Sequence, residues 1–201
     1  MKKTAIILKI SVVLFLAAAF FSCNPLENET RSGSLLVVDS LKGMDMEDNE
    51  VNFVQSDVIF EDPDTGSTTI HADVAVATLS ALPLNPSPVT GTSQYMDIKI
   101  TRYIVTYSRS DGNNAQGVDV PYSFEGHLSE TIPVGTTKDI SFVIVREVAK
   151  MEPPLIGLHE GRDKGVLEIK AKVEFFGHDL AERKVKATGY ISIFFANYAN
   201  E

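Results

Sequence analysis

The only cysteine in this 201-residue chain is Cys23, and it lies directly after an apolar run. A thiolate is the side-chain nucleophile that can form a thioether with a diacylglyceryl group. One acyl chain gives only marginal membrane binding, whereas two or more anchor a protein stably, at about 0.8 kcal/mol per buried CH₂. The type and position of Cys23 therefore predict lipidation. The alternative interpretation is an ordinary cysteine close to a signal cleavage site.

The residues before Cys23 are organised like an export signal. Lys2 and Lys3 give a positive start, and the twelve residues 10–21, which follow Lys9, are apolar except for one serine. This length lies within the roughly 7–15 residues of a secretory apolar region and is short of the about 20 needed to span a bilayer. The four residues Phe20-Phe21-Ser22-Cys23 resemble the bacterial lipobox, in which a small residue precedes the cysteine that becomes the mature N-terminus.

The lipobox resemblance implies signal cleavage between Ser22 and Cys23, which divides the chain into three parts. Residues 1–22 are expected to form a lipoprotein signal peptide, residues 23–33 a lipid-anchored flexible tether, and residues 34–201 a single domain. Asn24 follows the cysteine, and in the sorting rule of enteric bacteria an Asp there retains a lipoprotein in the inner membrane. The resemblance therefore implies an exported outer-membrane lipoprotein that faces the periplasm or the cell surface.

The mature chain would be acidic. The first 22 residues contain three of the 18 basic residues and none of the 27 acidic ones, so their removal changes the formal charge from −9 to −12. Without a stripe of Lys and Arg, a nucleic-acid partner is not expected. Electrostatic docking on anionic lipid is not expected either, so the acyl chains on Cys23 must hold the protein at the membrane. With no second cysteine, the stability of the domain must come from its hydrophobic core.

Two turns are rich in side-chain oxygens, namely Asp62-Pro63-Asp64-Thr65-Gly66 and Ser110-Asp111-Gly112-Asn113-Asn114. Ca²⁺ takes several oxygen ligands from short loops of this kind. Neither turn has the spacing of an EF-hand calcium loop, and Asp, Asn and Gly are also the residues that tight turns require without any metal. Turn chemistry is the favoured interpretation, and a calcium site is the alternative.

No catalytic or metal-binding pattern is present in the sequence. The four histidines are separated along the chain and none is paired four residues from another: His71, His127, His159 and His178. A zinc site would require distant histidines to converge, and no G-x-S-x-G nucleophile motif occurs. We therefore expect no enzyme, no metal and no cofactor. Acid pairs that hydrolyse glycosides are defined by their separation in space, so a hydrolase stays open as an alternative.

Three tyrosines and two arginines in the middle of the chain suggest a binding surface: Tyr103, Tyr107, Tyr122, Arg102 and Arg109. Aromatic and arginine side chains are enriched at interfaces, so a protein or carbohydrate partner is one interpretation. The favoured alternative is that the tyrosines are half-buried strand residues, one of whose hydroxyls locks a corner of the fold.

Alternating apolar residues predict a series of short strands. The clearest is 166–176, where Leu167, Ile169, Ala171, Val173 and Phe175 face inward, and residues 177–179 are expected to begin the return. In residues 70–77, Ile70, Ala72, Val74 and Val76 form the apolar face. Further strands are expected at 34–38, 56–60, 140–144 and 190–195, with an acidic loop at 43–50, an irregular Pro-containing loop at 82–92 and a helical turn at 147–151.

One predicted strand, residues 96–107, changes its apolar parity near Thr101 and Arg102. This change indicates a β-bulge or a strand that is covered on both faces. In all, seven or eight short strands without a helix of useful length predict an all-β fold, an immunoglobulin-like sandwich of two antiparallel sheets. A small β-barrel is the alternative. The Cys…Trp…Cys spacing of true immunoglobulin domains is absent, so the likeness concerns architecture alone.

Four segments together resemble a group of uncharacterised predicted lipoproteins of Gram-negative bacteria: residues 34–40, 107–122, 145–155 and 176–181. They span most of the mature chain. The resemblance implies an envelope lipoprotein with a β-sandwich domain, and it brings no functional residues and no activity.

The sequence thus predicts a lipid-anchored, non-catalytic envelope protein that serves as a binding or structural module. The main alternative is an accessory subunit of an envelope complex, which would dock through a sheet edge or an exposed apolar patch. A hydrolase that acts on cell-envelope or extracellular carbohydrate is the third and most distant hypothesis.

Overall fold

A computed structural model describes residues 32–47, 49–62, 64–86, 91–160 and 165–198. The expected signal peptide, Ser22, Cys23 and most of the expected tether lie outside these residues. Within the described part of the chain, no helix is long and apolar enough to cross a membrane.

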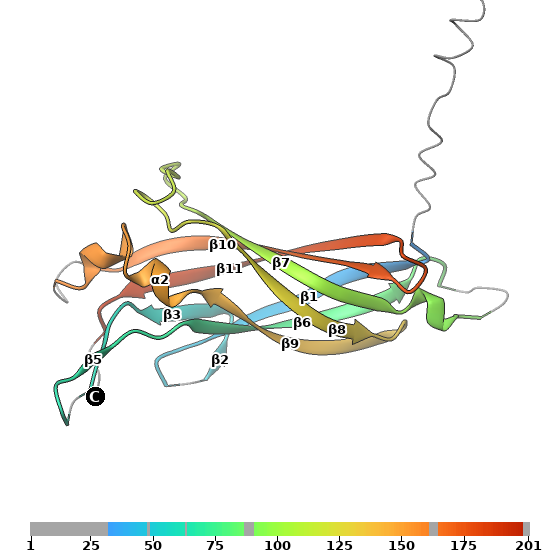
Figure 1. Cartoon of the computed structure of the whole chain (residues 1–201), viewed down its shortest axis with the longest axis horizontal. Helices are drawn as coiled ribbons and strands as arrows, with labels where there is room; N and C mark the ends of the chain where they lie inside the picture. Colours follow the sequence, from blue (N-terminus) through green and yellow to red (C-terminus); the bar gives the residue numbers. More distant parts are fainter. Residues whose placement is uncertain (1–31, 48, 63, 87–90, 161–164, 199–201) are drawn as a thin grey trace, which may run out of the picture. The chain divides into compact units, whose positions relative to one another are not determined.

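Strands make up most of the described residues (Figure 1). They are β1 (Ser34–Met44), β2 (Glu50–Val51), β3 (Phe53–Asp57), β4 (Phe60–Glu61), β5 (Thr68–Thr69), β6 (Asp73–Pro83), β7 (Ile98–Ser108), β8 (Phe124–Ile132), β9 (Thr136–Val145), β10 (Leu167–Asp179) and β11 (Lys184–Ala196). The helical elements are short: η1 (Gln94–Met96), α2 (Glu147–Lys150) and η2 (Leu155–Leu158). The helical turn expected at 147–151 is therefore confirmed as α2.

The strands form two main sheets, one in the order β2-β1-β6-β9 and the other in the order β3-β11-β10-β7-β8, with β4 and β5 as a separate ribbon. The predicted all-β sandwich is confirmed, and eight strands of the described residues are five or more residues long. One pairing differs from the antiparallel expectation, because β3 runs parallel to β11. Only Asn52 separates β2 from β3, so the chain changes sheets abruptly and enters the second sheet along its edge strand.

The core lies between the inner faces of the two sheets. On β10, the predicted inward residues Ile169, Ala171, Val173 and Phe175 are buried. Phe175 packs edge-on against Phe142 of β9, with 5.3 Å between the ring centroids, and Tyr103 of β7 packs on the same Phe142 at 5.1 Å. Full burial of such a side chain contributes about 1.5–3 kcal/mol, so this aromatic cluster is a main source of the domain's stability.

The inward face of β6 is the opposite of the one predicted. The strand begins at Asp73, its buried apolar residues are Ala75, Ala77, Leu79 and Ala81, and Val74 is 43% exposed. Apolar residues occupy both parities of this segment, so alternation alone could not choose a face. The strand also continues to Pro83, well past the predicted end at residue 77 and into the segment expected to be a loop.

The predicted β-bulge is confirmed, because the pairing of β7 with β8 shifts between Ile100 and Arg102. On the other side of β7, the pairing with β10 shifts between Phe176 and Gly177. A Cβ atom at Gly177 would lie 2.2 Å from the Lys99 carbonyl oxygen, so only glycine allows this close approach. The predicted return at 177–179 is wrong: β10 continues to Asp179. The turn follows, with Glu182 at a φ of 62°.

Two further strand predictions are corrected. The strand predicted at 56–60 is not continuous, because β3 ends at Asp57 and β4, which belongs to a separate ribbon, begins at Phe60. The first strand extends from Ser34 to Met44, so it takes up the first residues of the expected acidic loop and contains an irregularity between Val38 and Ser40. Strand β8 was not predicted at all. Its residues alternate between half-buried and exposed, but Gly126 and Glu130 interrupt the inward parity that Phe124, Leu128 and Ile132 share, so the apolar alternation is incomplete.

Candidate functional site

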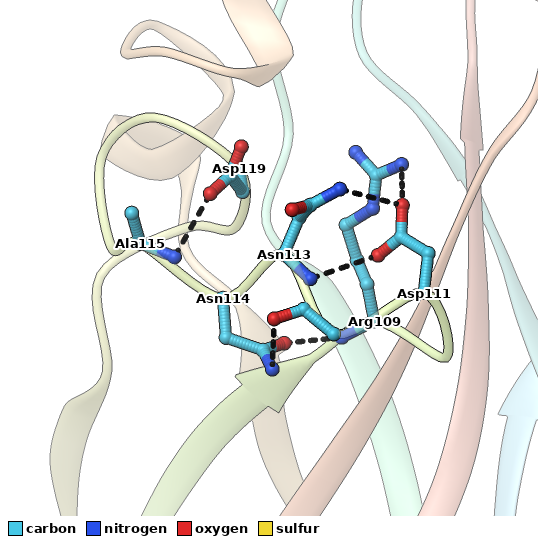
Figure 2. A network of polar contacts seen from close by, with 7 residues as sticks. Arg109, Asp111, Asn113, Asn114, Ala115 and Asp119 are labelled. Atoms are coloured by element: carbon cyan, nitrogen blue, oxygen red, sulfur yellow. Dashed lines mark hydrogen bonds and ion pairs between the residues drawn. The ribbon is translucent and has the colours of Figure 1, made fainter.

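The Asp-rich turn between β7 and β8 is closed by its own side chains (Figure 2). The Asp111 carboxylate accepts hydrogen bonds from the Arg109 guanidinium at 2.6 Å and from the Asn113 N–H at 3.1 Å. Asn114 Oδ1 accepts from the Arg109 N–H at 2.7 Å. The Asn113 N–H is the main cause of a pKa of Asp111 below its usual range. The oxygens of this turn thus serve as turn acceptors, which is the favoured interpretation of its sequence.

The second Asp-rich turn, between β4 and β5, follows the same local logic. Asp62 Oδ1 accepts from the N–H groups of Asp64, at 2.8 Å, and Thr65, at 3.1 Å. These backbone hydrogen bonds hold the pKa of Asp62 below its usual range. In the part of the chain that the structure describes, no group of three or more His, Cys, Asp or Glu side chains is placed to hold a metal ion.

The tyrosines and arginines do not form one surface. Tyr103 and Tyr107 are 5% and 4% exposed, because both lie on the inward parity of β7 after the bulge, whereas Tyr122 is half exposed. Arg102 pairs with Glu125 of β8 and lies over the Phe176 ring. Arg109 is engaged in the turn described above. The five residues therefore do not form the predicted surface, and the favoured alternative of buried strand residues holds for Tyr103 and Tyr107 but not for Tyr122, which lies outside the strands.

Tyr107 performs the locking role expected of one tyrosine. Its hydroxyl donates to the Ile144 carbonyl oxygen at 2.6 Å, which ties β7 to β9 across the core. Burial raises the pKa of Tyr107 far above its usual value. The group is therefore neutral throughout the physiological range and acts as a hydrogen-bond donor.

The four histidines lie on different elements. His71 lies between β5 and β6 and contacts Thr69 Oγ1 at 2.9 Å, while His178 on β10 contacts the Asp179 carbonyl oxygen at 2.9 Å. His127 belongs to β8, and His159 follows η2.

A buried lysine, which sequence reasoning did not single out, organises the end of the sandwich that carries α2. Lys150 is 1% exposed. Its Nζ donates to the Asp57 carbonyl oxygen at 2.7 Å and to Asp73 Oδ1 at 2.8 Å, so the short helix is fastened to β3 and β6. A lysine that is buried to this degree is almost always paired. The sequence around Lys150 is typical of a solvent-exposed turn, so the burial of Lys150 could not be predicted from it.

The carboxylates beside Lys150 keep unused hydrogen-bonding capacity. Asp57 Oδ1 accepts from the Tyr198 N–H at 3.2 Å. The second oxygens of Asp57 and Asp73 are buried and have no donor within hydrogen-bond distance among the described residues, but the Ser56 hydroxyl acts on Asp73 and the Ile59 N–H acts on Asp57, and both favour the ionised carboxylates. Burial raises the pKa of Asp73 against the opposing effect of Lys150, and it raises the pKa of Asp57 against the opposing effect of the Tyr198 N–H. One ammonium thus faces two carboxylates, which leaves an excess of acceptors.

A cavity of about 410 Å³ opens beside these carboxylates. Its volume falls within the roughly 300–1,000 Å³ that is typical of small-molecule sites. Met44, Met46, Phe60 and Val74 are among the apolar side chains that line it, and the acidic side chains are Asp45, Asp57 and Asp73. Met46 and Phe60 are each 39% exposed, so the apolar lining is open to solvent. The cavity therefore offers apolar contacts together with an acidic floor.

A scan against protein-family models found no match to this chain, and a search of curated proteins found none either. The chemistry of the cavity and the sequence around Cys23 are therefore the observations from which a function can be inferred.

Proposed function

We propose that this chain is a lipid-anchored, non-catalytic protein of the bacterial envelope, which binds a ligand through the cavity beside Lys150. The observation that carries the anchor is the single cysteine in Phe20-Phe21-Ser22-Cys23, placed after a cationic start and a twelve-residue, largely apolar segment. The acyl chains on Cys23 would provide the attachment to the membrane, which we infer to be the outer membrane.

The cavity supports a ligand that combines an apolar body with a cationic group. Phe60, Met44 and Met46 supply apolar contact area. Asp57 and Asp73 together hold two unused carboxylate oxygens and share one ammonium, so the local charge is negative. A primary ammonium on a short alkyl chain meets both conditions, because it donates three hydrogen bonds and adds a second positive charge where Lys150 alone faces two carboxylates.

A binding role is favoured over a catalytic one by the state of the titratable groups. The Lys150 ammonium is buried and bonded to two acceptors, so it cannot approach a substrate as a nucleophile or a base. The Tyr107 hydroxyl is likewise buried and committed to a carbonyl oxygen.

An accessory subunit of an envelope complex is the second candidate. Val148, Met151 and Ile156, which lie on or between α2 and η2, are 42%, 49% and 45% exposed. Apolar side chains that gather on one short segment favour a protein contact. If this candidate is correct, Val148→Glu and Ile156→Glu should abolish co-purification with one defined envelope partner and leave the cavity's ligand binding unchanged.

The anchor is tested by fractionation in a Gram-negative host. Cys23→Ala should release the protein from the membrane fraction and abolish incorporation of a fatty-acid label. Ser22→Ala is the matched control, because it keeps a small residue before the cysteine and should leave both unchanged. A Cys23→Ala protein that stays in the membrane fraction would contradict the proposal, since the uncleaved N-terminal segment would then be the anchor.

The ligand class is tested by titration of the mature chain with octylammonium and, separately, with octanoate, which has the same chain length and the opposite charge. Labelled methionine methyl groups report the binding by NMR. Met44 and Met46 line the cavity, whereas Met96 lies in η1, away from it. Octylammonium should shift the signals of Met44 and Met46 but not Met96. Equal responses to the two amphiphiles, or shifts at Met96 alone, would contradict the proposed ligand class.

A further inference from the structure

The sandwich has one end at which the described chain begins. Ser32 Oγ donates to Asp179 Oδ2 at 2.8 Å, which ties the entering chain to the end of β10. The Leu84 N–H donates to the Gly33 carbonyl oxygen at 2.8 Å, and the Leu180 N–H donates to the Asp97 carbonyl oxygen at 3.0 Å. We call this the entry end. It lies opposite the end that carries α2 (Figure 1).

Exposed apolar side chains surround the entry end. Leu35 and Leu82 are directly paired across β1 and β6, and they are 49% and 43% exposed on the outer face of that sheet. Three further apolar side chains lie at this end. The N–H groups of Leu84 and Leu180 donate the two hydrogen bonds just given, and Tyr95 precedes Met96, whose carbonyl oxygen accepts from the Ser34 hydroxyl. Leu84 is 50% exposed, Tyr95 63% and Leu180 41%. We call these five residues the apolar rim. Exposed apolar groups gathered in this way mark an interaction surface.

The connection to Cys23 determines what this surface can meet. Ser32 is nine residues beyond Cys23. A fully extended chain advances at most about 3.3–3.6 Å per residue, so the entry end lies within roughly 30 Å of the lipidated cysteine. The thirteen residues of β10 cover about 40 Å at 3.3 Å per residue, so the α2 end is a further strand length away. A lipid surface is therefore within reach of the apolar rim.

We propose that the apolar rim rests on the surface of the lipid bilayer, so that the cavity at the α2 end faces away from the membrane. This inference rests on the lipid anchor proposed above. Leucine and tyrosine are residues that favour the boundary between acyl chains and headgroups. A short covalent tether gives the rim a high effective concentration at the bilayer, so a shallow apolar contact is sufficient to keep the rim on the lipid surface.

The composition of the rim favours lipid contact through apolar side chains over headgroup attraction. Its five members are uncharged, and the mature chain has a formal charge of −12, because the segment before Cys23 contains three lysines and no acid. The contact should therefore be almost insensitive to salt, in contrast to that of a polybasic surface.

The test uses the absence of tryptophan from the sequence, so that one introduced tryptophan is the sole reporter. The mature lipoprotein is incorporated into phosphatidylethanolamine–phosphatidylglycerol vesicles whose acyl chains carry bromine near the headgroup. Leu84→Trp reports the entry end. Val118→Trp reports the opposite end. Strand β7 starts beside the entry end and runs away from it, and residue 118 follows this strand. The side chain of residue 118 is 67% exposed. Tyr95→Trp is a second, conservative reporter of the rim.

Bromolipid should quench Leu84→Trp and Tyr95→Trp at least twofold more strongly than Val118→Trp, and the difference should persist in high salt. Flotation with the vesicles measures the anchor separately. A protein that does not float would overturn the lipid anchor and this orientation with it. A protein that floats but shows equal quenching, or none at the rim, would overturn the orientation alone and would assign the rim to a protein partner.

Discussion

Each end of the sandwich holds an aspartate with little exposed surface, and the two carboxylates differ in how many donors they have. At the entry end, Asp179 is 1% exposed and accepts three hydrogen bonds, from the Ser32 hydroxyl and the Ala181 and Arg183 N–H groups. At the α2 end, Asp73 accepts a hydrogen bond from Lys150 through one oxygen, and its second oxygen makes no hydrogen bond to the described residues.

The pKa values of these two carboxyls are shifted in opposite directions. Burial acts to raise the pKa of Asp179, but the donors around it, led by the Arg183 N–H, outweigh burial and lower the pKa below its usual value. Burial also acts on Asp73, and there it outweighs Lys150 and raises the pKa. The difference lies in the number of donors, because each hydrogen bond to the charged form favours ionisation.

This contrast separates a structural site from a candidate binding site. A buried acceptor without a partner costs stability, and native proteins keep few of them. Asp179 closes the turn between β10 and β11 and leaves no unmet acceptor there. The unmet acceptors at Asp57 and Asp73 belong to two residues that line the cavity, and the two oxygen atoms themselves are buried.

The largest expected effect comes from Lys150→Met, which removes a buried ammonium and leaves the half-buried carboxylates of Asp57 and Asp73 without their cation. We expect it to lower the free energy of unfolding at neutral pH by about 3–5 kcal/mol, as measured by urea denaturation. Lys138→Met is the control, because Lys138 forms an exposed pair with Glu130, and its loss should cost less than about 1 kcal/mol. Equal costs for the two variants would show that the buried pair does not hold α2 in place.

Asp179→Asn should have the next largest effect. An amide of the same shape cannot present two acceptor oxygens to the three donors, so we expect a loss of about 1.5–3 kcal/mol in the free energy of unfolding, which is the contribution of hydrogen bonds to a charged group. Asp119→Asn is a matched control in an exposed loop, where Asp119 accepts one hydrogen bond from Ala115. A loss at Asp179 no greater than at Asp119 would contradict the structural role of this carboxylate.

Tyr107→Phe should cost about 1–2 kcal/mol, because it leaves the buried Ile144 carbonyl without its donor and creates no large cavity. Tyr190→Phe is the control, since Tyr190 is 57% exposed and its change should be close to neutral. Thermal and urea unfolding of the two variants provide the measurement. A neutral Tyr107→Phe would show that the hydroxyl does not lock β7 to β9.

The smallest effect, and the sharpest contrast between the two ends, is the pH dependence of stability. The lowered pKa of Asp179 contributes stability above the unfolded-state value near 4, and this contribution is lost as the pH falls through the folded-state value. The raised pKa of Asp73 has the opposite sign: its contribution is complete below the unfolded-state value and is lost as the pH rises through the folded-state value. The charges of Lys150 and His71 act on Asp73 and favour its ionised form, and the charge of Asp73 in turn raises the pKa of Asp57.

The stability of the wild type relative to Asp179→Asn should therefore decrease as the pH is lowered from 7 to 3, whereas its stability relative to Asp73→Asn should increase. Urea denaturation at each pH gives both differences. Two slopes of the same sign would refute the contrast between the ends.

The sequence predicted those parts of the molecule in which one face is consistently apolar. Strand β10 was recognised with its inward residues because charged side chains alternate with Ile169, Ala171 and Val173. The bulge near Thr101 was visible as a change of parity. For β6 the parity is ambiguous, and for β8 the apolar alternation is interrupted by Gly126 and Glu130, so pattern alone could not place them.

The cluster of charged residues at the α2 end could not be predicted from the sequence for a different reason. Lys150 is 93 residues from Asp57 and 77 residues from Asp73 along the chain, and only the folded topology brings the three together. A lysine near two prolines is typical of an exposed turn, and its burial depends on the strands that close around it. The anchor, by contrast, is a local signal, which is why Cys23 could be proposed from four residues.

The most direct test of the proposed anchor is the intact mass of the mature protein extracted from the membranes of a Gram-negative host. We predict a chain that begins at Cys23 and carries a diacylglyceryl group on its sulfur, with a further acyl chain on the new amine. A chain that begins at any other residue, or a Cys23 whose thiol is free, would contradict the lipid anchor and the orientation inferred from it.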